Sequence, residues 1–430
     1  MSRNDNMYHE LRENLRKASS NGTNVNDAGE FSSSQKRAGT RRPTASNRAR
    51  YQLVEVDGVL DWEEATDAPP IFQKRRRGLG SSPASGVIAS IDFEKLAPSK
   101  LVEFLVGKDH WLTPERGLRR FNPATNKLEP AAAPTAGEAL LLIHGTFSNG
   151  DNFINSLLGT QHGQDFLRDM GIKYNHQIYT FDHATLSVSP ILNAIELARL
   201  LGKSKAKFDV ISHSRGGLVA RWWCEAFDPQ SERCRKAILV GSPLAGTGLA
   251  APPNLRGTIR LLSNVGNALG KVAGMASTAV PVLGIVETLL HVMSSITSWT
   301  AKSPIVDAVV GMVPGLFAQS RVGNNPELLQ LRDLPTNPSR YFGVVSNFEP
   351  VDPTWAFWRV FRKEQLADAG ADLIFNGPND LVVDTPSMAD LQDGVAIPNN
   401  QIFDYGNSPI VHHLNYFDIS DTVKFWRDVL

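Results

Sequence analysis

Two serines, a histidine and two glycines stand where an apolar run passes into a helix-like pattern, in FDVISHSRGGLVARWW over residues 208–223. A serine at a sharp strand-to-helix turn can present its hydroxyl as a nucleophile, and small neighbours let the two backbones pass closely. The run Ser212-His213-Ser214-Arg215-Gly216 fits the G-x-S-x-G pattern of such turns, with serine in place of the first glycine. We therefore predict that Ser214 is a nucleophile. Because S-x-S-x-G also arises by chance in serine-rich loops, the rest of the chain must supply its partners.

A serine nucleophile needs a base, and an acid that orients the base. Downstream, Asp380 ends a tight Asn-Gly-Pro-Asn-Asp turn, where an exposed carboxylate beyond a strand is expected. Asp384 is the alternative acid, although it follows an apolar run and suits a cap of the next turn. The last two of the ten histidines, His412 and His413, precede a C-terminal helical segment. One of this pair is expected to be the base.

Oxyanion donors are expected from a second strand end, in LLLIHGTFSNG over residues 140–150. Gly145 would let the backbone approach a substrate closely, and the amides of Thr146 and Arg215 would be the two donors. His144 lies at the strand end ahead of the donor loop, so a structural role suits it better than the role of base.

The elements that must position these residues are short apolar runs that alternate with helical patterns. The runs cover residues 139–145, 176–183, 208–214, 236–243 and 340–347. A helix over residues 189–202 opens with Ser189 and Pro190 and closes at Gly202. This alternation predicts a mostly parallel sheet with helices on both faces. In such sheets active sites lie beyond the carboxyl ends of the strands, where Ser214 is expected.

Six blocks in the same order resemble the lipase- and esterase-like branch of the α/β-hydrolase superfamily, including the group related to GPI inositol-deacylases. They are HGTFSN, FDHATLSVSP, ISHSRGGLVAR, GSPLAGTGLA, GPNDLVV and HHLNYF, within about residues 138–430. The resemblance implies the α/β-hydrolase fold, with Ser214 as nucleophile, Asp380 as acid and a histidine of HHLNYF as base. We choose His413 over His412, because the stretch His413-Leu-Asn-Tyr-Phe fits the family pattern better. The resemblance implies no cofactor and no metal.

The part of the chain before this region falls into two segments. Residues 1–50 are rich in Ser, Asn, Gly and Arg, which predicts a disordered and mildly basic tail. Residues 51–130 carry one strand-like pattern over 51–62 and a short helix within 88–107, and we expect this extension to pack on the main body. The hydrolase domain would then cover residues 131–430. The N-terminus lacks the apolar core of a secretory signal, which favours a cytoplasmic protein.

An insertion over about residues 244–335 separates two of the expected core strands. Its middle, residues 272–300, is apolar, with Glu287 as its only acid and Pro281 as an interruption. It has no uninterrupted apolar run of the roughly 20 residues that span a bilayer. The expected structure is a helical cap or a lid, with peripheral membrane contact as the alternative to simple packing. Gly266, Gly270 and Gly274 share one helix face and indicate close helix packing. A hydrophobic or lipid-like ester suits either version.

Composition excludes several other classes of protein. The 430 residues are 42% hydrophobic and 20% charged with zero formal net charge, so nothing global favours nucleic acid. Two cysteines rule out a disulfide scaffold, and no His/Cys cluster has the spacing of a metal site. The leading hypothesis is a carboxylic-ester hydrolase. An acyltransferase or thioesterase that uses the same triad, or a non-catalytic binding protein on this fold, are the alternatives. The sequence leaves the oligomeric state open.

Overall fold

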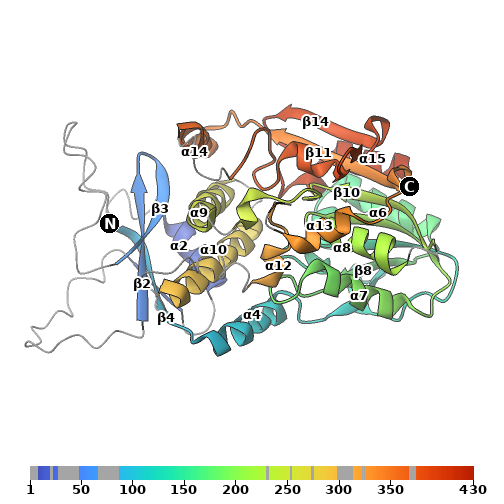
Figure 1. Cartoon of the computed structure of the whole chain (residues 1–430), viewed down its shortest axis with the longest axis horizontal. Coiled ribbons are helices and arrows are strands. Elements are labelled where there is room, and N and C mark those ends of the chain that lie inside the picture. Colours follow the sequence, from blue (N-terminus) through green and yellow to red (C-terminus); the bar gives the residue numbers. More distant parts are fainter. Residues whose placement is uncertain are drawn as a thin grey trace, which may run out of the picture. The chain divides into compact units, whose positions relative to one another are not determined.

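The computed structural model describes residues 8–19, 23–27, 48–65, 87–228, 232–251, 254–272, 276–297, 313–321, 323, 325–367 and 374–430. The chain divides into two compact units (Figure 1). The first contains Met1–Leu101, Leu255–Val309 and Asp352–Ala369, and the second contains Val102–Asn254, Val310–Val351 and Gly370–Leu430. All of the site residues that the sequence suggested belong to the second unit.

The described residues of the second unit form an eight-stranded sheet of order β14-β11-β10-β9-β7-β8-β5-β6. The strands are β5 (Gly117–Asn122), β6 (Lys127–Pro130), β7 (Glu138–Ile143), β8 (Ile178–Asp182), β9 (Lys207–His213), β10 (Cys234–Val240), β11 (Tyr341–Phe348) and β14 (Ile402–Ser408). The six strands from β14 to β8 are parallel, whereas β5 and β6 form an antiparallel hairpin whose first strand runs against β8. The five apolar runs of the sequence correspond to β7, β8, β9, β10 and β11, as predicted.

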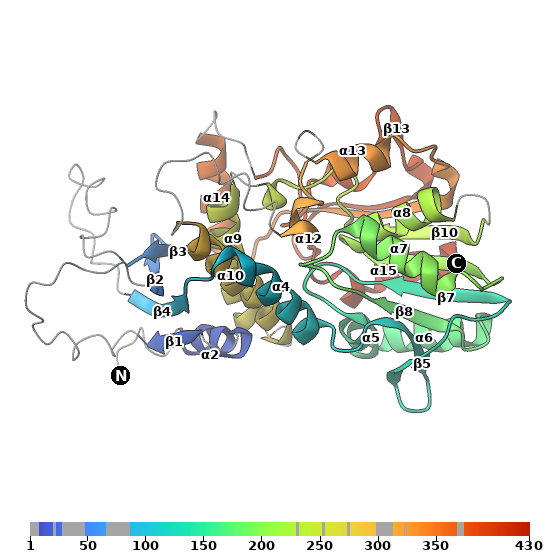
Figure 2. The same cartoon turned by 60° about the horizontal axis from the view of Figure 1, so that its bottom comes forward.

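Helices cover both faces of this sheet (Figure 2). On one face lie α7 (Pro190–Leu201) and α8 (Gly216–Trp222), and a π-helical turn, Trp223–Phe227, continues α8. On the other face lie α5 (Gly150–Leu158), α6 (Gln161–Lys173) and α15 (Ser420–Val429). Both faces of the sheet are therefore buried, which explains why the central strands are continuous apolar runs in the sequence. This is the α/β-hydrolase fold that the sequence predicts.

Strand register brings three strand ends together at the carboxyl edge of the sheet. Ile143 at the end of β7 pairs with Ser212 of β9, and His213 pairs with Val240 at the end of β10. Residues just after these positions, including Gly145, Ser214 and Gly241, therefore fall at one edge. Smaller elements of this unit are α12 (Pro314–Phe317), α13 (Pro326–Arg332), β12 (Asp390–Gln392) and β13 (Val395–Ala396), and α4 (Pro98–Leu112) leads into it.

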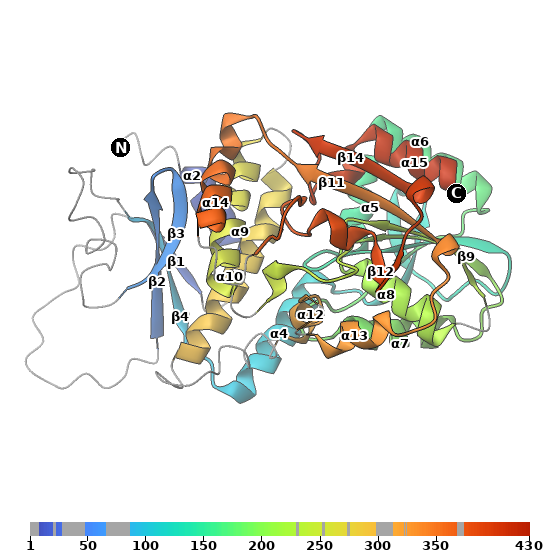
Figure 3. The ribbon, with the colours of Figure 1, turned by 45° about the horizontal axis from the view of Figure 1, so that its top comes forward.

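The first unit combines a four-stranded antiparallel sheet with helices from distant parts of the chain (Figure 3). The sheet has the order β1-β4-β2-β3, from β1 (Asn24–Asp27), β2 (Arg48–Val56), β3 (Val59–Glu64) and β4 (Val87–Glu94). The helices are α2 (His9–Ala18), α9 (Leu255–Lys271), α10 (Ala276–Thr297) and α14 (Ala356–Ala367). Asn264 of α9 accepts from the Leu60 amide at 2.9 Å and donates to the Leu60 carbonyl at 2.8 Å, which joins helix and sheet.

The N-terminal segments differ from their prediction in three ways. Residues 9–18 of the expected disordered tail form α2, because Leu11 and Leu15 are buried in the first unit. Residues 51–62 form a hairpin rather than one strand, since Asp57 and Gly58 take positive φ values of 54° and 81° and make the turn. Residues 102–130 belong to the main unit, because β5 and β6 complete its sheet.

The expected insertion is divided between the two units. Leu255–Val309, with α9 and α10, belongs to the first unit, and the part from Val310 onward belongs to the second. A Cβ on Gly266 would lie 2.7 Å from Leu283 Cδ2, so glycine allows the close packing of α9 on α10 that its spacing indicates. Gly274 lies outside the described residues. Among the helices that the structure describes, none combines the length and apolar character needed to cross a membrane.

The core beneath α15 gives a stability prediction. Trp426 is fully buried, with ring centroids 5.7 Å from Phe166 and 5.3 Å from Phe417. Trp426→Ala should lower the free energy of unfolding by about 3–5 kcal/mol, because it leaves a cavity. Trp111→Ala removes a side chain that is 53% exposed and should cost less than about 1 kcal/mol. Chemical denaturation followed by far-UV circular dichroism measures both; equal losses would contradict this packing.

Candidate active site

Ser214 occupies a strained turn between β9 and α8. Its φ is +53°, a left-handed conformation that is unfavourable for a residue with a Cβ. The Ser214 amide donates to the carbonyl of Val240 at 2.9 Å, so the neighbouring strand β10 holds the turn. The side chain stands at the carboxyl edge of the sheet and is 5% exposed. This is the geometry of a nucleophile elbow.

The turn at Ser214 requires small residues, because neighbouring backbone segments approach it closely. A Cβ on Gly216 would lie 2.4 Å from the carbonyl oxygen of Ile143, so only glycine lets α8 start this close to β7. Ser212, which replaces the usual first glycine, is fully buried and its hydroxyl donates to the Ile238 carbonyl at 3.3 Å. The neighbouring strand thus satisfies the extra hydroxyl.

Asp380 is the better placed of the two candidate acids. It is fully buried, and its Oδ1 accepts from the amides of Val382 at 3.1 Å and Val383 at 2.9 Å. Asp384 instead accepts from the Asn376 amide and from Arg321, 3.0 and 3.2 Å away. Burial raises the pKa of Asp384, and neither contact involves a histidine. Asp384 therefore braces the loop that carries Asp380.

His413 is the histidine that meets Asp380. Its Nδ1 lies 2.8 Å from Asp380 Oδ2, and its amide donates to the Asp380 carbonyl at 2.9 Å. The Nδ1 proton therefore points at the carboxylate, which leaves Nε2 as the basic nitrogen. His412 turns elsewhere: its Nδ1 accepts from the Leu414 amide at 3.2 Å, and its ring meets Phe348 edge to face.

Two neighbours bring the Asp380–His413 pair to the elbow. His213, next to Ser214 in the chain, donates from Nε2 to the His413 carbonyl at 2.9 Å, and the two rings lie 4.7 Å apart. A Cβ on Gly241 would come within 3.1 Å of Asp380 Oδ2 and 3.2 Å of His413 Nδ1, so glycine leaves room for the pair. Within the described residues no hydrogen bond joins Ser214 Oγ to His413. Such contacts often tighten only with substrate.

The predicted oxyanion loop packs directly on Ser214. A Cβ on Gly145 would lie 2.9 Å from Ser214 Cβ. Thr146 follows, and its hydroxyl contacts Gln319 Nε2 at 2.9 Å. The Phe147 amide is turned away, because it donates to the Thr185 hydroxyl at 3.2 Å and Phe147 has a φ of +55°. The Phe147 amide is therefore engaged elsewhere, and the Thr146 amide, next to the contact of Gly145 with Ser214, stays the predicted donor of this loop.

Arg215, whose amide is the second predicted donor, sends its side chain into the protein. The guanidinium is fully buried, and its Nη2 donates to the Val188 carbonyl at 2.6 Å. Burial lowers the pKa of Arg215 to about 10, so the group stays charged at neutral pH. The amide itself opens α8, where the helix dipole favours negative charge.

His144 has the structural surroundings that its position suggested. Its Nδ1 lies 2.9 Å from the Gly145 carbonyl, and its Nε2 accepts from the His183 amide at 3.2 Å. Burial lowers its pKa, and its ring stacks on that of His183 at 4.1 Å. Both ring nitrogens are therefore occupied, so His144 is not available as a base.

Three residues beside the site carried no role in the sequence analysis: His213, Gln319 and Tyr416. Each contacts a residue more than thirty positions away in the chain. The spacing of residues along the sequence therefore does not reveal these contacts. In the sequence His213 stands at the x position of S-x-S-x-G, and Tyr416 lies within the HHLNYF block that favours His413.

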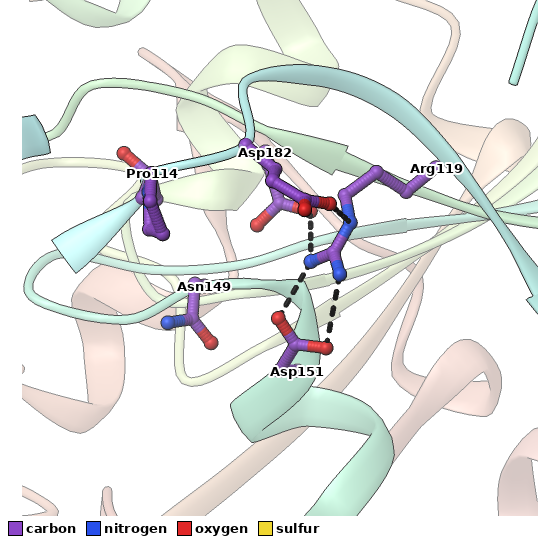
Figure 4. Close-up of a pocket in the computed structure, with 7 residues that line it drawn as sticks. Pro114, Arg119, Asn149, Asp151 and Asp182 are labelled. Carbon is purple, nitrogen blue, oxygen red and sulfur yellow. Dashed lines mark hydrogen bonds and ion pairs between the residues drawn. The ribbon is translucent and has the colours of Figure 1, made fainter. Parts of the chain in front are cut away.

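A charged cavity of about 130 Å³ lies beside the oxyanion loop, at the ends of β5 and β8 (Figure 4). Arg119 donates to both oxygens of Asp151, at 2.6 and 3.2 Å, and lies 3.6 Å from Asp182. The lining residues are Thr113, Pro114, Glu115, Arg119, Asn149, Asp151 and Asp182. Its charges make it unsuitable for an acyl chain. No group of three or more His, Cys, Asp or Glu side chains in the described part of the chain could hold a metal ion.

Two neutral histidines in the site predict a loss of stability in acid. Burial lowers the pKa of His213 and of His412 to about 3, whereas an unfolded histidine titrates near about 6.5. The folded state therefore binds fewer protons in this window, so stability is complete above about pH 6.5 and falls as the pH approaches 3. In His412→Asn the unfolding free energy should fall less steeply, by up to about 1.4 kcal/mol per pH unit.

Urea unfolding at a series of pH values measures these slopes. His110→Asn changes an exposed histidine of α4 and should keep the wild-type slope. A His412→Asn slope equal to that of the wild type would show that burial of His412 does not drive the acid sensitivity.

Comparison with known proteins places the chain in a family. A family model described as "Domain of unknown function (DUF7379)" matches residues 113–430, more than half of the chain. No curated protein matches the sequence. Lipase BlEst2 of Bacillus licheniformis in its mature form is 13% identical, with 70% of this chain and 93% of that chain covered and a TM-score of 0.38. Lipase 1 from Pelosinus fermentans is 15% identical, with 68% and 97% covered and a TM-score of 0.39.

A thermophilic esterase from Thermogutta terrifontis is 13% identical, with 73% of this chain and 99% of that chain covered and a TM-score of 0.34. Likeness at this level assigns neither an activity nor a substrate to this chain. The likeness to GPI inositol-deacylases stays a prediction. What the match over residues 113–430 establishes is membership: the chain belongs to the DUF7379 family.

Proposed function

We propose that the chain is a serine hydrolase that cleaves carboxylic esters with Ser214, His413 and Asp380. The observation that carries the proposal is the contact of His413 Nδ1 with the buried Asp380 at 2.8 Å, next to a serine held at a φ of +53°. A strained serine beside an imidazole whose far nitrogen is fixed by a carboxylate has the parts of a nucleophile, a base and an orienting acid.

The proposed reaction uses ordinary acyl-transfer steps. Ser214 Oγ attacks the ester carbonyl while its proton passes to His413 Nε2, which gives a tetrahedral oxyanion and an imidazolium. The amides of Thr146 and Arg215 donate to the oxyanion. The imidazolium then gives its proton to the departing alkoxide as the C–O bond breaks. Water, deprotonated by the same nitrogen, releases the acyl group as a carboxylic acid and restores Ser214.

Asp380 would stabilise the imidazolium without taking its proton. Its Oδ1 accepts two backbone amides, which fix the carboxylate so that Oδ2 stays directed at His413. The cation that forms on His413 is then paired within a buried site, where an unpaired charge would be costly.

Hydrophobic or lipid-like esters are the substrate class that we propose. The support is the apolar stretch of residues 272–300, most of which forms α10. Many apolar side chains of α10 are buried in its own unit, including Val282, Val286 and Leu290. Contact of α10 with a lipid surface would therefore require that unit to open, and activity on long chains should depend on an interface.

Turnover of p-nitrophenyl esters tests the triad. Ser214→Ala should lower kcat/KM by about 10⁴-fold or more, because the nucleophile is lost. Asp380→Asn should lower it by about 10³–10⁴-fold, since the imidazole loses its orienting charge. Asp384→Asn is the matched control and should cost less than about tenfold, because Asp384 bonds Asn376 and Arg321 instead of a histidine. Full activity in Ser214→Ala would rule out the assignment.

A series of acyl chain lengths, with and without lipid vesicles, tests the substrate class. Serine-dependent turnover that rises with chain length and with vesicles is expected. Turnover confined to short chains would contradict the lipid-like class but keep the esterase. Labelling of Ser214 by a fluorophosphonate probe without ester turnover would point to transfer to another acceptor, and no labelling of folded protein would favour a binding role.

A further inference from the structure

Tyr416 reaches the candidate acid from the turn that follows the base. It begins a short 3-10 helix, Tyr416–Asp418, and is 1% exposed. Its hydroxyl donates to Asp380 Oδ2 at 3.0 Å, the same oxygen that His413 Nδ1 contacts at 2.8 Å. A phenol and an imidazole therefore share one carboxylate oxygen.

The carboxylate of Asp380 is surrounded by donors. Its Oδ1 accepts from the amides of Val382 and Val383, and its Oδ2 accepts from Tyr416 and His413. Burial, and then the charge of Asp380, raise the pKa of Tyr416 well above its ordinary value, so the phenol remains a donor at working pH. The amides are fixed by the backbone, so among the described residues the Tyr416 phenol is the side chain that competes with the imidazole for Oδ2.

We propose that Tyr416 is a positioning residue that sets the basicity of His413 through Asp380. The inference rests on the proposed function, in which His413 is the base. A donor on Oδ2 withdraws negative charge from the side of the carboxylate that faces the imidazole. It also keeps the carboxylate from turning. Tyr416 thus holds the base less basic, and more available in its neutral form, than Asp380 alone would make it.

Other titratable groups lie near the base and Tyr416, namely His213, His412, Tyr405 and Asp404, and Asp418 shares the 3-10 helix of Tyr416. Burial lowers the pKa of both histidines to about 3, so they stay neutral at working pH. Burial raises the pKa of Tyr405, and Asp404 is exposed. Burial raises the pKa of Asp418 to about 6. Because Asp418 titrates in the same range as a histidine, the titration must be read at His413 itself.

Tyr416→Phe removes the hydroxyl and keeps the ring. Without this donor, Asp380 should stabilise the imidazolium more, so the titration midpoint of His413 should rise by roughly half a pH unit or more. NMR of the imidazole protons measures the midpoint in the full chain, with His413→Asn to assign the signal. The acidic limb of the kcat/KM profile should move to higher pH by the same amount.

Tyr405→Phe is the matched control. Its hydroxyl contacts Thr422 Oγ1 at 2.7 Å, and its ring lies 6.5 Å from that of Tyr416 without contacting Asp380. In Tyr405→Phe the titration midpoint of His413 and the acidic limb of the kcat/KM profile should equal those of the wild type. A purely structural role of Tyr416 would lower activity or stability at every pH with both values unchanged, and that result would overturn the proposal.

A second replacement at Tyr416 should shift the His413 midpoint in the opposite direction, and it keeps the proposal testable if Tyr416→Phe does not fold. Site-specific incorporation of 3-fluorotyrosine at Tyr416 makes the phenol more acidic and a stronger donor, so the midpoint should fall. A rise or no change would overturn the proposal. The NMR titration needs no turnover. If no ester is hydrolysed but the midpoints move as expected, the proposed function fails while the effect of Tyr416 on His413 stands.

Discussion

The left-handed backbone of Ser214 is the constraint on which the site depends. A residue with a Cβ at a φ of +53° is held at a cost of about 1–3 kcal/mol and persists only where its surroundings fix it. Here β10 binds the Ser214 amide through Val240, while Gly216 places α8 against the end of β7. The register of β7, β9 and β10 is thus what makes the hydroxyl of Ser214 face the site.

Buried carboxylates fix the backbone of the loops around the turn at Ser214. Asp109 is fully buried, and it accepts the amides of Thr185 at 2.8 Å and Ser187 at 2.7 Å. Thr185 in turn accepts the Phe147 amide through its hydroxyl. An unpaired charge in this position would be costly, so the loop must keep its amides directed at Asp109. Asp109, outside the proposed triad, therefore helps to shape the predicted oxyanion loop, and Asp380 follows the same rule in the segment between α14 and β12.

Sequence reasoning works here where the signal is local. The elbow serine, the strands on either side of it and the structural role of His144 follow from a strand, a turn and a helix that are continuous in the chain. The choice between Asp380 and Asp384 is different, because the two residues are four apart in one loop. In the structure the long-range contact to His413 separates them. In the sequence the preference for Asp380 rests on its Asn-Gly-Pro-Asn turn and on the resemblance. His213, Gln319 and Tyr416 act across the fold, where neither period nor spacing carries information.

Long-range contacts also explain why the folded structure of the N-terminal part was not predicted from the sequence. Residues 1–50 have too few large apolar residues to bury a core alone, which is why their composition indicates disorder. In the structure, α2 and the β1–β4 sheet bury their apolar faces with α9 and α10, which come more than 150 residues later. The side-chain amide of Asn264 in α9 bonds both the amide and the carbonyl of Leu60 in β3, which links the late helices to the N-terminal sheet. Met1–Leu101 and Leu255–Val309 therefore belong to one folded unit, and each of these segments alone lacks the apolar area that would reveal it.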